Sequence, residues 1–241
     1  MAWDVKLGTV LADLSTDIGF DLGIPGLGLE TEGDITLGVE WELDLGFGLS
    51  FEDGFFFDVS DPHELLFDFD VTLPASIVGT LAFLELRGTD KSLDFDPGAG
   101  TDMRNTGLGA TFKVDLFDDG GGGDGKIGFT EFGDLGLNAG VAASATAALG
   151  LELGLSGELF SEIFGEGAGD VIAGFPKVTS DFLFLWELGS RVAGGSLEDI
   201  GNNSTFLSFG DLGNQGFAAI QEGLQVVAFE NVALDLGTFL S

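Results

Sequence analysis

The chain has 241 residues, and its 8 Lys and Arg against 41 Asp and Glu give a formal net charge of −33 at pH 7. Nucleic acids and anionic lipid surfaces are bound through basic patches, so this charge excludes both as partners. Hydrophobic residues nevertheless make up 44% of the chain, including 24 Phe, which indicates a folded protein and not a disordered acidic tail.

Few residue types are available for catalysis. The chain has no Cys, no Tyr and one His, which excludes a thiol nucleophile, a disulfide framework and a multi-histidine zinc site. Carboxylate pairs abound, but no spacing singles one out, so we expect a non-enzymatic protein. The single histidine, His63, lies in a turn sequence and is expected at the surface. The lack of Cys is typical of an exported bacterial protein.

The first predicted element is a long β-strand over residues 35–51. All nine odd positions of this stretch are apolar, and the even positions are polar or Gly. A period of two places the apolar side chains on one face of a strand, and no helix gives this segregation. At about 3.3 Å per residue the strand is roughly 55 Å long. It therefore either bends at Gly46 and Gly48 or belongs to an unusually tall sheet.

Shorter alternating stretches follow, separated by turn sequences such as Asp53-Gly54. Strands joined by short polar turns form antiparallel sheets, here with one apolar face and one acidic, glycine-rich face. We therefore predict an all-β fold, with a mainly antiparallel, strongly curved sheet that forms a barrel or a sandwich. The stretches are residues 55–59, 67–73, 108–116, 145–155 and 182–188.

Two segments toward the C-terminus break the alternation. Apolar residues recur at spacings of three and four from Phe217 to Val227, which predicts an amphipathic helix over residues 216–228. A second short helix is expected within residues 161–174. No shift in composition marks a domain boundary, so residues 1–241 are expected to form one β-rich domain, as a module of a larger extracellular protein.

The glycine-rich stretch of residues 118–131 has the most specific motif. From Asp124 onward it resembles the second half of an EF-hand calcium loop, with Gly125 at loop position six and Glu131 at position twelve. Ca²⁺ needs about six to eight oxygen ligands, and the final Glu can donate both of its oxygens. The predicted calcium ligands are Asp118, Asp119, Asp124 and Glu131.

The first half of this loop departs from the EF-hand pattern. Positions one and three fall on Gly120 and Gly122, and Asp119 lies one residue too early, so only a lengthened loop can use it. The alternative interpretation is a solvated glycine turn between two strands. A second acidic group either shares a divalent ion or forms a solvated loop; its members are Asp90, Asp94, Asp96 and Asp102.

Four stretches share an acidic, glycine-rich composition with strand-like alternation. They are residues 20–29, 41–51, 53–55 and the loop ending at 125–127. They resemble β segments of very large secreted or surface calcium-binding proteins of bacteria, of the adhesin type. The resemblance implies an extracellular or cell-surface structural or adhesive module stiffened by Ca²⁺. Its implied partners are neighbouring modules of the same chain or a surface receptor.

Two other functions stay open on the sequence alone. Long faces of Leu and Phe are also typical of a β-barrel carrier that binds an apolar ligand, or of a barrel that associates with a membrane. An excess of acid with few Lys is also typical of a halophilic soluble protein, in which the charge indicates nothing about ligands.

Overall fold

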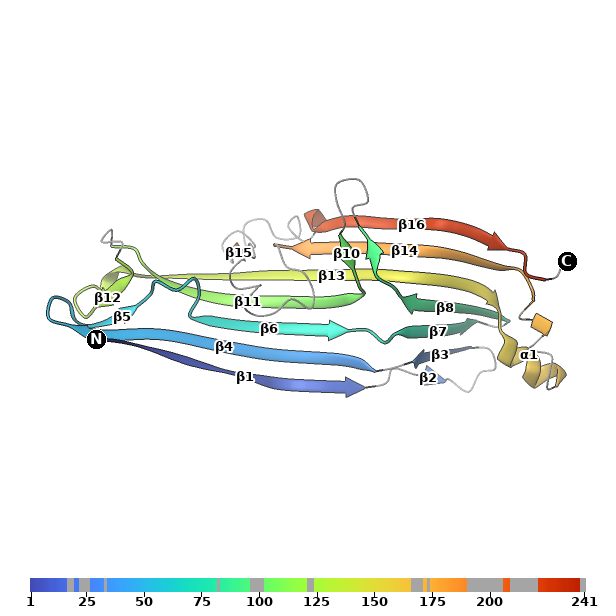
Figure 1. Cartoon of the computed structure of the whole chain (residues 1–241), viewed down its shortest axis with the longest axis horizontal. Helices are drawn as coiled ribbons and strands as arrows, with labels where there is room; N and C mark the ends of the chain where they lie inside the picture. Colours follow the sequence, from blue (N-terminus) through green and yellow to red (C-terminus); the bar gives the residue numbers. More distant parts are fainter. Residues whose placement is uncertain are drawn as a thin grey trace.

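A computed structural model describes residues 1–16, 20–21, 27–32, 34–81, 83–95, 102–120, 124–165, 171–172, 174–189, 206–208 and 221–238. Fourteen of the described strands form one mainly antiparallel sheet, which curls strongly into a half-barrel, and two further strands form a short ribbon. Figure 1 shows the strands of the sheet lying side by side along the molecule. The all-β, antiparallel and strongly curved fold predicted from the alternation is therefore confirmed. In the described part of the chain, no helix has the length and apolar character needed to span a membrane.

Strand β13 (Leu135–Leu155) organises the sheet because it is long enough to pair with several strands. One of its edges pairs first with β11 (Gly107–Asp118) and then with β8 (Leu84–Asp90). Its other edge pairs with β14 (Lys177–Leu188) and the short β15 (Leu207–Ser208). The strands lie along the long axis of the molecule, so that β11 and β8 follow one another in a single row (Figure 1).

Further strands extend these rows to both edges of the sheet. Beyond β14 lies β16 (Leu224–Asp235), and the strands beyond β11 are β6 (Leu65–Thr72), β4 (Ile35–Ser50) and β1 (Ala2–Thr16). The end of β4 also pairs with β5 (Gly54–Asp58), which pairs with β12 (Lys126–Gly128). Beyond β8 lie β7 (Ser76–Leu81), β3 (Leu27–Glu32) and β2 (Phe20–Asp21). The separate ribbon is β9 (Leu93–Asp94) with β10 (Met103–Arg104).

The long strand predicted over residues 35–51 is β4, which runs without interruption from Ile35 to Ser50. Of the two possibilities that its length left open, the tall sheet is the one observed. The predicted stretches at 55–59, 67–73, 108–116, 145–155 and 182–188 fall on β5, β6, β11, β13 and β14, except that β5 ends at Asp58 and β6 at Thr72.

The pairing register places the apolar side chains of all these strands on one face of the sheet. We call this the apolar face; it consists of the odd residues of β4, β6 and β13 and the even residues of β11 and β14, together with their partners across the sheet. Aromatic rings follow one another on it, as between Trp3 and Phe47, whose centroids lie 5.9 Å apart, and between Phe182 and Phe229, at 5.0 Å. The opposite, polar face carries Gly, Ser, Thr and most of the acidic side chains of the paired strands.

The polar face is the more buried of the two. Leu66, Thr111 and Ser144 project from it and are fully buried, whereas Leu137 and Phe229 on the apolar face are 65% and 62% exposed. A curled sheet shelters one face more than the other, and here small residues allow the polar face to be the sheltered one. The apolar face therefore remains open over much of the described sheet.

The helix predicted over residues 216–228 is wrong from Leu224 onward, where β16 begins. Residues 216–220 lie outside the described part of the chain. The spacing of apolar residues is overridden because β16 contains several Val residues, which favour strands, and because its backbone pairs with β14. The second predicted helix is present in part: α1 spans Gly157–Phe164, earlier than the expected residues 161–174.

Candidate functional site

The predicted calcium loop connects β11 to a single 3₁₀ turn, η1 (Phe132–Asp134), by way of β12. It therefore lacks the flanking helices of an EF-hand, because a strand precedes it and β12 pairs with β5 within it. Gly125 has a φ of 71°, as the sharp turn requires, and its carbonyl accepts the Val59 N–H at 2.7 Å. The turn is thus held against the end of β5.

Three of the four predicted ligands accept a hydrogen bond from the backbone of their own loop. Asp118 accepts from the Gly120 N–H at 2.8 Å, Asp124 from the Lys126 N–H at 3.0 Å, and Glu131 from the Gly128 N–H at 2.9 Å. The fourth, Asp119, donates its own N–H to the carbonyl of Asp134 at 2.8 Å, which ties together the two ends of the loop.

These contacts stabilise the turn with or without a metal ion. Residues 121–123 lie outside the described part of the chain. Among the described residues, no group of three or more His, Asp or Glu side chains is arranged to hold a metal ion. Calcium binding at this loop stays a prediction.

The second acidic group is tied into the sheet by hydrogen bonds. Asp90 accepts the Thr106 N–H at 2.9 Å, and Asp94 accepts the Asp102 N–H at 3.0 Å. Asp102 in turn binds the guanidinium of Arg104, which also reaches Glu187 on β14 at 2.5 Å. Asp96 lies outside the described residues. The described members therefore anchor the β9–β10 ribbon to the sheet.

A cluster of titratable side chains that the sequence did not indicate lies on the polar face. It is found just before the start of β6, between β4 and β11. We call Asp44, His63 and Glu64 the buried acid cluster. Asp44 is 6% exposed and Glu64 is 3% exposed. The Asp44 N–H donates to the Glu64 carbonyl at 2.9 Å, and the Glu64 N–H donates to the carbonyl of Val114 on β11, also at 2.9 Å. These backbone hydrogen bonds therefore fix Asp44 and Glu64 in place.

The side chains of the cluster are only partly satisfied. Glu64 accepts the Leu116 N–H at 2.5 Å, and Asp44 binds the ammonium of Lys6 at 2.5 Å. The second carboxylate oxygen of each residue, and Nδ1 of His63, are buried without a hydrogen-bond partner among the described residues. An unpaired buried oxygen disfavours the ionised carboxylate, and at Glu64 this favours the protonated form.

Burial shifts the pKa of several groups in this region. It raises the pKa of Glu64 to about 7, although the hydrogen bond from Leu116 opposes this effect, and it lowers the pKa of His63. Burial also raises the pKa of Asp61 and Asp115 nearby. His63, which was expected at the surface, is half-buried. Only the burial of the polar face, which alternation does not indicate, could have revealed this cluster.

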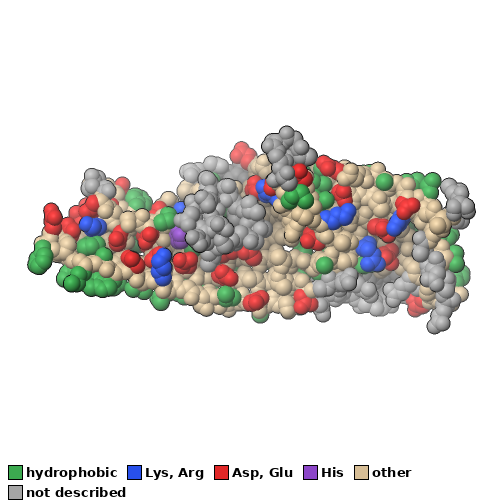
Figure 2. Space-filling view, in the orientation of Figure 1, with side chains coloured by type: hydrophobic (Ala, Val, Ile, Leu, Met, Phe, Trp, Pro, Cys, Tyr) green, Lys and Arg blue, Asp and Glu red, His purple; other side chains and the backbone are tan. Residues whose placement is uncertain are grey.

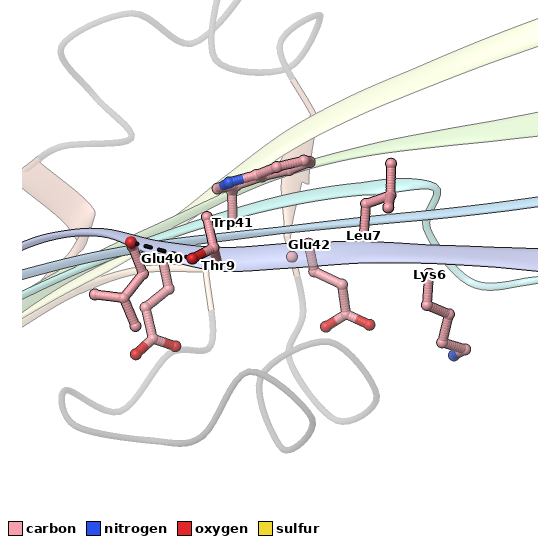
Figure 3. Close-up of a pocket in the computed structure, with 8 residues that line it drawn as sticks. Lys6, Leu7, Thr9, Glu40, Trp41 and Glu42 are labelled. Carbon is pink, nitrogen blue, oxygen red and sulfur yellow. Dashed lines mark hydrogen bonds between the residues drawn. The ribbon is translucent and has the colours of Figure 1, made fainter.

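The edge formed by β1 and β4 carries a shallow pocket of about 350 Å³, lined by Lys6 to Val10 and by Glu40 to Glu42. Figure 3 shows Trp41 and Leu7 on one side of the strands and the charged side chains of Glu40, Glu42 and Lys6 on the other. Side chains from both faces of the sheet therefore line this pocket at the edge of the sheet. Figure 2 shows acidic side chains spread along the length of one broad side of the molecule.

Comparison of the chain with protein-family models, with curated proteins and with solved structures finds no match.

Proposed function

We propose that this chain is a non-enzymatic binding module that takes up an apolar ligand without net negative charge on its apolar face. The observation that carries the proposal is the exposure of that face at positions far apart along the sheet, such as Leu137 and Phe229. Contiguous exposed apolar surfaces of more than a few hundred Å² are typical of binding sites, because leaving them in water is unfavourable.

The charge of the chain narrows the class of ligand. A net charge of −33 repels anionic head groups, whereas a zwitterionic or uncharged molecule with long apolar chains approaches without that penalty. Side chains of Leu, Val and Phe dominate the face and offer no array of hydrogen-bond donors that would select a polar ligand. We therefore expect recognition of acyl chains rather than of a head group.

The three Trp residues of the chain provide the test because all of them lie on the apolar face. Trp3 pairs with Phe47, Trp41 with Phe67 and Trp186 with Ala145. In vesicles of phosphatidylcholine with brominated acyl chains, we expect quenching of the tryptophan fluorescence. Vesicles of the unbrominated lipid should shift the emission to the blue without quenching, and brominated phosphatidylglycerol should quench less at low salt.

Two neighbouring residues of β14 give a matched pair of variants. Val178 lies on the apolar face and is 41% exposed, whereas Thr179 lies on the polar face. Val178→Gln should weaken quenching several-fold and Thr179→Gln should not. Equal quenching by both variants, or none in the wild-type protein, would refute binding on the apolar face.

We propose as a second candidate a calcium-stabilised structural or adhesive module at the cell surface. It is favoured by the closure of the loop through the hydrogen bond between Asp119 and Asp134, which holds four acidic residues within one short segment. Calcium outside cells is present at about millimolar concentration, which suits weak extracellular sites. The bound ion would offset repulsion between the loop carboxylates.

Thermal unfolding tests this candidate in EDTA, in CaCl₂ and in NaCl of matched ionic strength. A ligand that binds only the folded state raises Tm, so Ca²⁺ should raise it by more than NaCl does. Asp124→Ala and Glu131→Ala should each reduce the calcium-specific part. If CaCl₂ and NaCl raise Tm equally, and neither variant changes this, the loop is a glycine turn that binds no calcium.

A further inference from the structure

Strand β1 forms one edge of the sheet, and among the described strands it pairs with β4 alone (Figure 1). Met1 and Leu49 exchange both backbone hydrogen bonds, at 2.8 and 2.7 Å. In an antiparallel ladder such pairs alternate, so the odd residues of β1 direct their N–H and C=O groups toward β4. The even residues from Ala2 to Val10 therefore direct theirs outward, away from the sheet.

Over residues 2–10 this edge lacks the bulges by which sheets often prevent further pairing, because its one register shift against β4 lies beyond, between Val10 and Ala12. Its register with β4 is regular from Ala2 to Val10, and Trp3 and Leu7 are 47% and 50% exposed. The opposite edge, β16, differs: its pairing with β14 shifts register near Asn231, which has a positive φ of 50°. Bulges of this kind disfavour the addition of another strand, so the regular stretch of β1 from Ala2 to Val10 is better suited to pairing than β16.

We propose that β1 pairs antiparallel with β1 of a second copy of this chain, with Val5 opposite Val5 across the two-fold axis. In this register Asp4 of each copy lies opposite Lys6 of the other, on the polar face. Trp3 lies opposite Leu7 on the apolar face. Asp4 and Lys6 are both even residues, so their backbone N–H and C=O groups point outward and would form the hydrogen bonds with the new strand.

The charges select this register from its neighbours. Sliding one copy by two residues, the smallest step that keeps the hydrogen-bond pattern, places Asp4 opposite itself in one direction and Lys6 opposite itself in the other. Like charges directly opposite each other are unfavourable in a sheet. The Val5-centred register is the one that makes two opposite-charge pairs.

A second copy also fits the chemistry of this edge despite the net charge of −33. Lys6 already binds Asp44 of its own chain, and its side chain remains 68% exposed, so Asp4 of the other copy can approach it. At an ionic strength of about 0.15 M, charges farther apart than about 8 Å are largely screened. Association should therefore be weak at low salt and stronger at physiological salt.

Single-cysteine variants test the register, because the native chain has no Cys. Residues opposite each other in a non-hydrogen-bonded pair have Cα atoms about 4.5 Å apart, within the range of a disulfide. Val5→Cys should therefore form a disulfide-linked dimer in a glutathione redox buffer. Leu7→Cys is the matched control, because its two copies would lie about 13 Å apart along the strands.

Charge variants test the partner by sedimentation equilibrium. Asp4→Lys places a second lysine opposite Lys6 of the other copy, and Lys6→Asp places a second aspartate opposite Asp4. Each variant should therefore self-associate about tenfold more weakly than wild type. An equimolar mixture of the two should restore association, because both pairs in the mixed dimer are then of opposite charge. Circular dichroism of each variant confirms that the fold is retained.

The remaining outcomes overturn the proposal. Cross-linking of Leu7→Cys to the same extent as Val5→Cys would indicate non-specific contact through the apolar face. Cross-linking of Leu7→Cys alone would indicate another register. A wild-type protein that stays monomeric at physiological salt, or variants whose mixture associates no better than either alone, would exclude a β1–β1 dimer.

Discussion

Glu64 illustrates how the position of a residue between two strands can determine the pKa of its side chain. Its backbone bridges β4 and β11, so the carboxyl group is carried into the sheltered polar face whether or not it has partners there. One oxygen accepts the Leu116 N–H and the other has no partner among the described residues. Desolvation consequently dominates and raises its pKa to about 7.

This shift predicts a pH-dependent stability. The pKa of Glu64 rises from 4.5 to about 7 on folding, so between these values the folded state binds more protons than the unfolded state. The contribution of Glu64 is therefore fully present below pH 4.5 and is lost as pH rises through 7. Glu64→Gln keeps the acceptor for Leu116 and removes the titration.

Urea unfolding at several pH values checks this prediction. The variant should match the wild type near pH 4.5 and exceed it in unfolding free energy above pH 7. Self-repulsion of the other carboxylates acts on both proteins alike, so the difference between the two profiles isolates Glu64. Parallel profiles would show that Glu64 ionises freely in the folded state.

At the scale of the element, β4 shows why glycine alternates with large apolar residues. A methyl group added at Gly48 would lie 2.8 Å from the carbonyl oxygen of Met1 and would also collide with the ring of Phe56. The same addition at Gly38 meets no atom closer than 3.9 Å. Both glycines lie on the polar face of one strand, but only Gly48 is required by close packing.

These two positions make a matched pair of substitutions. Gly48→Ala should lower the unfolding free energy by about 1–3 kcal/mol, because β5 and the start of β1 must shift. Gly38→Ala should be neutral or should stabilise by up to about 1 kcal/mol, because Ala restricts the unfolded chain. Urea unfolding followed by tryptophan fluorescence measures both, and equal effects would contradict the packing argument.

At the scale of the whole molecule, both the net negative charge and the open shape of the sheet disfavour a compact folded state. The described ion pairs use most of the few basic side chains, as in Lys91 with Asp181 and Lys177 with Glu152, and leave a large negative excess. An open half-barrel also buries less apolar surface than a closed one. Screening should thus raise Tm in the NaCl arm of the unfolding experiment even without Ca²⁺.

The sequence by itself determined the local features of this fold. Alternation over residues 35–51 identifies β4 and the set of side chains that share its apolar face, because a strand has a period of two whatever surrounds it. The same reasoning located β6, β11, β13 and β14. It also found the turn at Gly125, where a positive φ favours glycine.

Only the tertiary structure decided which face is covered and which edges are open. Alternation shows that the two faces of a strand differ, but whether a face is buried depends on how distant strands curl the sheet. The curl of the sheet placed Glu64 and His63 on the sheltered side. The same long-range pairing made residues 224–235 a strand, because the edge of β14 offers hydrogen bonds that outweigh a local helical spacing. Pairing between distant segments is a property of the assembled sheet, and no local pattern contains it.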